Sequence, residues 1–187
     1  MDFMNRTKYG VVVTENVQAT QWGGHIYSLV DDAKDVENGW FGHVGAKVDR
    51  EISEFLTPTT ASIGTKKAVL AAAPAEIFYA PTPEGLQEFY FINKQGKPFR
   101  AYDLAENDEF SITEYTIDTL GDAAVKGNFV VLQDGSNRLK EVATAPSDHA
   151  FYGEIIDLDS SPLRPYMMVL GQRPAKFIGI RVVKNSV

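Results

Sequence analysis

Short stretches in which apolar and polar residues alternate run along much of the chain. Near the C-terminus, Ile178, Ile180 and Val182 fall on one face of an extended segment, while small and charged residues occupy much of the other. Phe110 and Ile112 share a face in the same way, with a serine between them. Because the side chains of a strand point alternately to its two faces, this period of two predicts β-strands with one buried face.

The residue types in these stretches also favour strands. Valine, isoleucine, threonine and the aromatic residues make up about a third of the chain, and their side chains suit a pleated, half-buried surface. Short helices are predicted only at Pro83–Glu88 and Thr116–Leu120. Strands are predicted at Gly10–Glu15, His25–Val30, Trp40–Val48, Lys67–Ala72, Glu76–Tyr79, Phe89–Ile92, Arg100–Leu104, Glu109–Thr113, Asn128–Leu132, Leu139–Ala143, Phe151–Leu158, Tyr166–Leu170 and Phe177–Val183.

Turn signals separate these strands at short intervals. Clear examples are Asn38-Gly39, Lys94-Gln95-Gly96-Lys97 and Asp134-Gly135-Ser136, whose residue types favour tight turns. Many short strands at this spacing predict an all-β fold, a sandwich or barrel of about a dozen strands.

Proline- and alanine-rich stretches at 71–75 and 143–147 suggest borders within the chain. On that basis residues 1–9 form an N-terminal arm, and residues 10–85 with 146–187 form a β domain. Residues 86–145 then form a small inserted β-barrel. One continuous sandwich is the alternative.

Charge is unevenly distributed. The chain has 18 basic and 25 acidic residues, a net charge of −7, which argues against nucleic acid as a direct partner. Seven acids and no lysine or arginine lie between Asp103 and Asp122, whereas five bases and no acid follow Asp159. The segments are either two solvated faces or complementary patches that orient identical subunits or a subunit on a partner lattice.

Composition limits the class of protein. There is no cysteine, which excludes disulfides, a thiol nucleophile and cysteine-based zinc sites. The longest apolar run, Ala68–Ala73, is far short of the ~20 residues of a membrane-spanning helix. The first nine residues do not resemble a signal peptide. We therefore expect no membrane partner.

Candidate chemistry is sparse. His25, His43 and His149 fall in no metal-ligand motif, although His25 and His43 could meet across neighbouring strands. The acidic turn that contains Asp31, Asp32, Asp35 and Glu37 lacks the spacing of a calcium loop. We therefore expect no enzymatic activity, no catalytic or metal-binding residue and no cofactor.

A surface that contacts a partner or ligand is a better candidate for the functional site than a catalytic or metal centre. Trp22 and Trp40 both lie beside glycines, a setting in which an exposed tryptophan can anchor an interface or stack on a sugar. A core tryptophan at a strand end is the alternative. The residues chosen as a candidate interface or ligand surface are Tyr9, Trp22, Trp40, Arg164, Arg173 and Lys176.

Several stretches together resemble the capsid decoration (cement or auxiliary head) proteins of tailed bacteriophages. The stretches are Gly24–Leu29 continuing to Glu37–Gly39, Gly96–Leu104, Asn107–Thr113, Lys126–Val130 and a closing Ile180–Asn185. The resemblance implies an oligomeric virion protein, made in the host bacterial cytoplasm, that binds and stabilises the capsid shell. Its partners would be the major capsid protein and copies of itself, and the family contributes no catalytic residue.

Two other functions stay open, the first of them within the same class of virion structural protein. A tail-tube or head–tail connector subunit is one, and a long flexible loop at Glu51–Lys66 would favour the tube. A carbohydrate-binding or adhesion module that uses Trp22 and Trp40 is the other. A hydrolase with His25 or His43 as its base has the least support.

Overall fold

The structure is a computed structural model, which describes residues 9–21, 25–73, 91–159 and 176–186. These residues form two β-sheets, one of them closed into a barrel, so the all-β prediction is confirmed. The only helices in these ranges are α1 (Gln18–Gln21), α2 (Thr60–Ile63) and a 3-10 turn at Glu114–Thr116. None of these described helices is long and apolar enough to cross a membrane.

The first sheet has seven strands in the order β1-β7-β12-β11-β9-β10-β8. Neighbours pair antiparallel, except that β10 and β8 are parallel. Its strands are β1 (Val12–Asn16), β7 (Glu109–Thr113), β8 (Ile117–Asp118), β9 (Phe129–Gln133), β10 (Ser136–Val142), β11 (Phe151–Asp159) and β12 (Phe177–Asn185). In β7 and β12 the faces predicted by alternation are confirmed, since Phe110, Ile112, Ile178, Ile180 and Val182 all lie in one buried cluster.

The second sheet is a closed barrel in the order β2-β4-β3-β5-β6. Its strands are β2 (Ile26–Val30), β3 (Phe41–Lys47), β4 (Ile52–Leu56), β5 (Val69–Ala71) and β6 (Phe99–Asp103). The barrel closes through two pairings of β2, parallel with β4 and antiparallel with β6. Leu29, Phe55 and Phe99 are among the buried residues of its interior, where the two phenylalanine rings pack edge to face at 5.3 Å.

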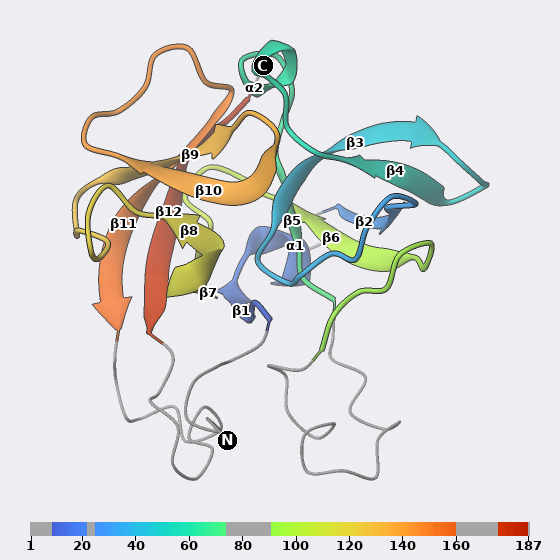
Figure 1. The fold of residues 1–187 in the computed structure, drawn as a ribbon, viewed down its shortest axis with the longest axis horizontal. Helices are drawn as coiled ribbons and strands as arrows, with labels where there is room; N and C mark the ends of the chain where they lie inside the picture. The colour runs from blue at the N-terminus through green and yellow to red at the C-terminus, as the bar shows by residue number, and fades with distance from the viewer. Residues whose placement is uncertain (1–8, 22–24, 74–90, 160–175, 187) are drawn as a thin grey trace, which may run out of the picture.

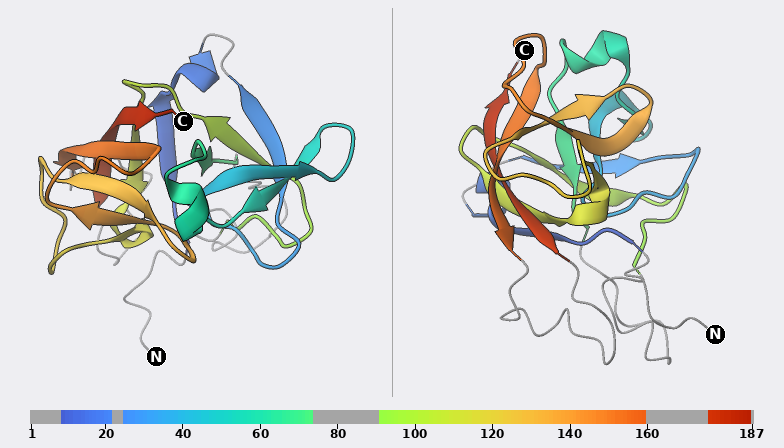
Figure 2. Two further views of the ribbon diagram at one scale, coloured as in Figure 1. Left: turned by 90° about the horizontal axis from the view of Figure 1, so that it is seen from above. Right: turned by 60° about the vertical axis from the view of Figure 1, so that its left-hand side comes forward.

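The barrel and the seven-stranded sheet share one core. Figures 1 and 2 show the sheet on one side of the molecule and the barrel on the other. Phe41 projects from the barrel strand β3 between Phe110 of β7 and Phe151 of β11, with ring centroids 5.8 and 5.3 Å away. Phe41 is fully buried, and its cluster includes residues of both sheets. Burial of this apolar surface holds the two sheets together.

The position of the barrel corrects the predicted organisation. The barrel is built from strands between residues 26 and 103, not from residues 86–145. The described part of 86–145 supplies β6 to the barrel but β7 to β10 to the other sheet. Barrel closure depends on pairing between β2 and two strands distant in sequence, which alternation within a segment cannot reveal.

The segment Glu51–Lys66 is not a long flexible loop, so that prediction is wrong. It contains β4 and α2, and both are fixed to their surroundings. Thr60 donates its backbone N–H to Asp134 Oδ1 at 2.9 Å, and Gly135 donates to the Pro58 carbonyl at 2.9 Å. This segment is therefore not the flexible loop that would favour a tail-tube subunit.

Other predictions near the middle of the chain had mixed outcomes. The prediction of a helix at Thr116–Leu120 is wrong, because the chain completes the 3-10 turn at Thr116 and then forms β8. The predicted turns at Gly39, Gly96 and Gly135 are confirmed by their positive φ angles of 86°, 68° and 69°. Three predicted elements lie outside the described residues: Glu76–Tyr79, Pro83–Glu88 and Tyr166–Leu170. Of the strand predicted at Phe89–Ile92, only the last two residues are described, and they do not form a strand.

Candidate interface surface

A hollow of about 180 Å³ opens on the side of the molecule formed by the seven-stranded sheet. It lies where the first residues of β12 meet the last residues of β11 and the segment that follows the 3-10 turn. Its lining residues are Glu114, Ala123, Ala124, Leu158, Lys176, Phe177 and Ile178. We call this feature the sheet hollow. Five of its seven lining residues are apolar, so it suits an apolar side chain better than a polar ligand.

A buried carboxylate fixes the loop beside the hollow. Glu141 lies on the inward face of β10 and is fully buried. Its Oε2 accepts the Leu120 N–H at 3.0 Å, while its Oε1 accepts the Val125 N–H at 2.9 Å and Asn128 Nδ2 at 2.7 Å. Gly127 adds a backbone bond to the Ile155 carbonyl at 2.8 Å. The loop 119–128 is therefore held by hydrogen bonds near both its ends.

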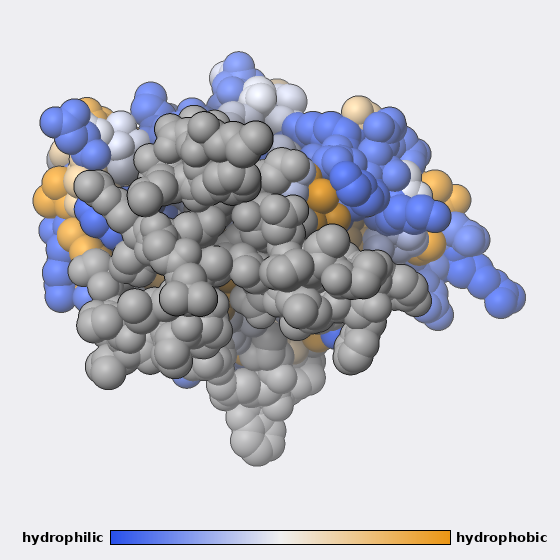
Figure 3. All heavy atoms as spheres, turned by 60° about the horizontal axis from the view of Figure 1, so that its bottom comes forward, coloured by the Kyte–Doolittle hydropathy of each residue, from blue (hydrophilic) through white to orange (hydrophobic). Residues whose placement is uncertain are grey.

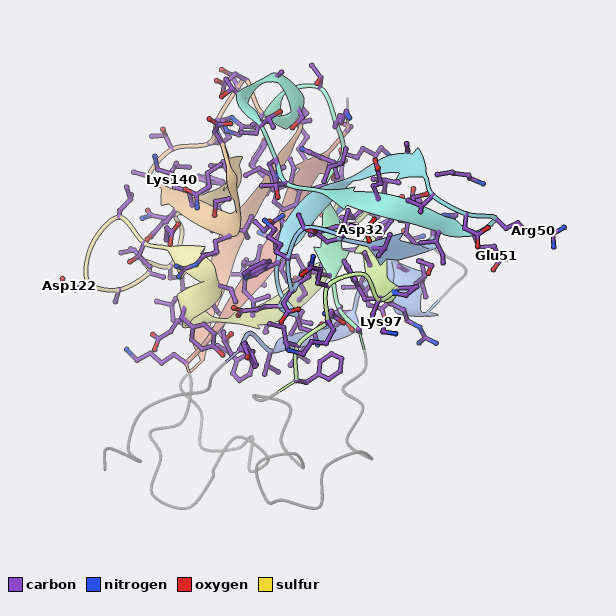
Figure 4. All side chains as sticks on the ribbon, turned by 45° about the vertical axis from the view of Figure 1, so that its right-hand side comes forward. Asp32, Arg50, Glu51, Lys97, Asp122 and Lys140 are labelled. Carbon is purple, nitrogen blue, oxygen red and sulfur yellow. The ribbon has the colours of Figure 1, made fainter. Side chains whose placement is uncertain are left out.

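The fixed loop presents apolar side chains to solvent. Leu120 and Val125 are 57% and 54% exposed, and Leu158 at the hollow is 41% exposed. Figure 3 shows hydrophobic surface along the edge of the molecule that carries the seven-stranded sheet, and Figure 4 shows Asp122 at the outer end of the loop. A held loop loses little conformational freedom on binding, so this surface is already organised for contact with a partner.

One charge of each sign lies at the rim of the sheet hollow. The Glu114 N–H donates to the Lys176 carbonyl at 3.0 Å, which places the two residues side by side. Both side chains are exposed. Of the three predicted interface residues that the structure describes, Lys176 is thus the one that lines the hollow.

The two other predicted residues that the structure describes, Trp40 and Tyr9, are not among the lining residues of the hollow. Trp40 is half-buried and packs against the barrel interior, with Lys34 Nζ 5.5 Å from the centre of its ring. Tyr9 is half-buried, and its backbone carbonyl accepts a hydrogen bond from the Tyr115 hydroxyl. Trp22, Arg164 and Arg173 lie outside the described residues.

A second hollow, of about 340 Å³, lies on the barrel beside Asp31, Lys34 and Thr57. Its central ammonium group already has partners. Lys34 Nζ donates to Thr57 Oγ1 at 2.9 Å and to Asn137 Oδ1 at 2.6 Å, and Asn137 Nδ2 donates to the Phe41 carbonyl at 2.6 Å. This network links the barrel to β10, which gives Lys34 a structural role at the junction of the two sheets.

The histidines do not form a pair. His25 is exposed and packs edge to face on Tyr27, whereas His43 is only 1% exposed. His43 Nδ1 lies 2.8 Å from the Lys67 carbonyl, which fixes Nδ1 as the protonated nitrogen. Burial lowers the pKa of His43 below 6.5. The hydrogen bond to the Lys67 carbonyl acts against this lowering, whereas the positive charge of Lys66 lowers the pKa further. Within the described ranges, no group of three or more histidine or acidic side chains is placed to hold a metal ion.

The acidic turn is also structural. Asp31 Oδ1 accepts the backbone N–H groups of Ala33 and Lys34 at 2.8 and 3.2 Å, which is a local turn. Asp35 instead pairs with Lys94 Nζ at 3.0 Å. Glu37 accepts the Gly10 N–H at 2.9 Å, and burial raises its pKa above 4.5. The carboxylates bond to different parts of the chain and do not converge on one point.

The acidic and basic segments meet inside the chain. Strand β12 carries the basic Arg181 directly opposite the acidic Glu109 of β7. Arg181 also forms an ion pair with Glu154 of β11 at 2.6 Å. At this position a residue of the basic segment therefore lies opposite a residue of the acidic segment within one sheet, so here the two segments do not mark two separate faces.

Comparison with protein-family models, with curated proteins and with solved structures found no match.

Proposed function

We propose that the chain is a non-enzymatic virion structural protein that binds and stabilises the capsid shell of a tailed bacteriophage, as an oligomer. The observation that supports this role is the sheet hollow with its fixed loop, because it offers exposed apolar side chains in a set geometry. An apolar centre with a charged rim is the usual composition of a protein-binding surface.

A decoration protein does not need one strong site. It contacts a shell in which the same surface is repeated many times, and each further contact of an oligomer is intramolecular once the first has formed. A modest contact surface such as this one is then sufficient for stable attachment. The net charge of −7 also favours solubility of the unattached chain.

The carbohydrate-binding alternative has less support. A sugar-binding tryptophan offers an open ring face, but Trp40 packs against the barrel interior and lies below the Lys34 ammonium. The sheet hollow lies on the other sheet, and none of its described lining residues is a tryptophan. We therefore retain the shell-binding role as the proposed function.

The test is reconstitution on shells that lack the chain. Purified protein is added to them, and both the amount bound and the temperature of shell disruption are measured. We expect binding that saturates at a fixed ratio to the shell protein and raises the disruption temperature. Absence of binding would overturn the proposal.

A matched pair of variants tests the surface itself. Leu158 at the hollow and Ile26 on the barrel are 41% and 42% exposed, so replacing either by arginine removes similar apolar area. We expect Leu158→Arg to bind shells more weakly than Ile26→Arg, and equal binding by the two variants would count against this surface.

A further inference from the structure

The hairpin formed by β3 and β4 ends in an exposed tip that is closed by backbone hydrogen bonds. Every residue from 46 to 51 is exposed, and Figure 4 shows Arg50 and Glu51 at its end, away from the rest of the molecule. Both Val48 and Asp49 donate their N–H groups to the Ile52 carbonyl, at 2.9 and 3.2 Å. We call residues 46–51 the hairpin tip.

Val48 is an unusual residue to find in such a place. It is 53% exposed, and its neighbours in the hairpin tip are Lys47, Asp49, Arg50 and Glu51. A single exposed valine needs no explanation alone. Here it is held by a closed turn and surrounded by charges of both signs, which is the arrangement of an apolar knob with a polar border.

The sheet hollow has the complementary arrangement. Its centre is apolar, with Ala124, Leu158 and Phe177 among its lining residues, and its rim has the acidic Glu114 and the basic Lys176. Its volume of about 180 Å³ is far above the ~10–15 Å³ that a cavity needs to hold one water molecule. A valine side chain therefore fits within it, and the charges on the hairpin tip can pair with either rim charge.

The two features lie on opposite sides of one molecule. In Figure 4 the hairpin tip, marked by Arg50 and Glu51, is at one end of the view, while Asp122, beside Ala123 of the hollow, is at the other. The tip of a chain therefore cannot reach its own hollow. Every other copy of the chain, however, presents the same hairpin tip with its exposed Val48.

We propose that the sheet hollow receives the hairpin tip of a second copy of this chain, with Val48 inserted between the apolar walls. The proposal rests on the oligomeric role proposed above and divides this surface between two contacts. The hollow receives the neighbouring copy, while the exposed Leu120 and Val125 of the loop 119–128 are left for the shell. Leu158→Arg then weakens shell binding because the oligomer and its avidity are lost. Because the two surfaces are different and lie at opposite ends of the molecule, two copies cannot exchange tips reciprocally, so the contact is head-to-tail and leads to a closed ring or an open array. One such contact is small, so the assembly depends on concentration or on a lattice.

Sedimentation velocity over a concentration series tests this contact with the full chain. We expect the wild type and the Ile26→Arg control to self-associate. Val48→Asp and Leu158→Arg should each associate at least about tenfold more weakly, because each buries a charge in an apolar contact. A wild type that stays monomeric, or variants that associate like the wild type, would overturn the proposal.

Mixing the two variants gives a sharper result. Val48→Asp keeps an intact hollow, and Leu158→Arg keeps an intact tip, so the mixture should form a one-to-one complex and nothing larger. This result also shows that both variants are folded. If each variant is folded by circular dichroism but the mixture stays monomeric, the proposed contact is wrong.

Binding to shells is measured separately by co-sedimentation of the wild-type chain. Self-association without shell binding would overturn the capsid role and leave the head-to-tail contact standing. Shell binding by a chain that stays monomeric would overturn the head-to-tail contact and leave the capsid role standing.

Discussion

Glu141 illustrates how one side chain decides the shape of a surface segment. Strand β10 buries Asn137, Leu139 and Glu141 on one face, and two of these three residues are polar. The polar groups are satisfied, because Asn137 bonds to Lys34, Thr57 and the Phe41 carbonyl, and Glu141 bonds to the loop 119–128. A buried polar group without such partners would strongly destabilise the fold.

Replacing Glu141 by glutamine should therefore destabilise the protein. The amide group of glutamine would place an N–H donor against one of the N–H groups that the carboxylate now accepts. We expect a loss of about 1–3 kcal/mol in the free energy of unfolding, measured by urea denaturation. Glu51→Gln on the exposed hairpin tip is the matched control and should change it by less than about 0.5 kcal/mol. Equal stability of the two variants would contradict this role of Glu141.

His43 should make stability depend on pH. Its pKa is below 6.5 in the folded chain, so the unfolded chain binds the proton more readily between that pKa and 6.5. The contribution of His43 is full above pH 6.5 and is lost as the pH falls through 6.5 towards the folded pKa. The slope from this one proton is at most about 1.4 kcal/mol per pH unit.

Denaturation between about pH 5.5 and 7.5 measures this slope. His43→Asn keeps an N–H donor for the Lys67 carbonyl but does not titrate, so we expect a flatter profile than in the wild type. His25→Asn, on an exposed histidine, is the matched control. The raised pKa of Glu37 contributes with the opposite sign nearer 4.5, and it is common to all three proteins. An unchanged slope in His43→Asn would contradict the account.

At the scale of the elements, the barrel wall depends on a close approach at Gly42. A Cβ atom there would lie 2.5 Å from Cε2 of Phe55 and 2.8 Å from the Leu56 carbonyl oxygen. Gly42→Ala should therefore destabilise the protein by about 1–3 kcal/mol. Gly121→Ala is the matched control, since no atom lies within 4 Å of a Cβ there, and it should be neutral or slightly stabilising. Thermal unfolding of both variants measures the difference, and equal melting temperatures would contradict it.

Local patterns predicted most strands but not how the strands pair. Strand β7 was predicted with its observed bounds, because Phe110 and Ile112 alternate with polar residues. Strand β4 was missed, because its buried residues are Ser53 and Phe55, so its alternation is weak. The barrel was misplaced because its closure depends on strands that are far apart in sequence.

The candidate surface was predictable only in part. Lys176 was chosen because it lies in the basic C-terminal segment, but the hollow beside it comes from three separate parts of the chain. Glu141 gave no signal, since an acidic residue in an alternating strand is usually solvent-exposed. The exposed Leu120 and Val125 in a polar loop are the one local signal that could have indicated this surface.

At the scale of the whole molecule, Asn185 joins the sheet to the barrel. It is buried at the end of β12, and its Oδ1 accepts the Ala68 N–H at 2.8 Å. Its Nδ2 donates to the carbonyls of Ala68 and Leu104 at 3.0 and 2.8 Å. These three bonds connect the last strand of the sheet to segments that flank the barrel strands β5 and β6.

Removing this side chain should weaken the whole fold. We expect Asn185→Ala to lower the free energy of unfolding by about 2–4 kcal/mol, because it leaves buried backbone groups without partners. Asn185→Asp should not restore stability, since a carboxylate cannot donate to the two carbonyls. Val183→Thr, on a more exposed side chain of the same strand, is the control and should change little. Urea denaturation in which Asn185→Ala matches this control would contradict the role.

The capsid role is the central claim, and it requires that the chain be a component of the virion. Peptide mass spectrometry of density-banded particles, with copy number measured against the major shell protein, tests it. We predict that the chain is present in many copies and in a fixed ratio to the shell protein. A number sufficient for only a single ring would favour a head–tail connector instead. Absence of the chain from particles made by its own genome would contradict the account.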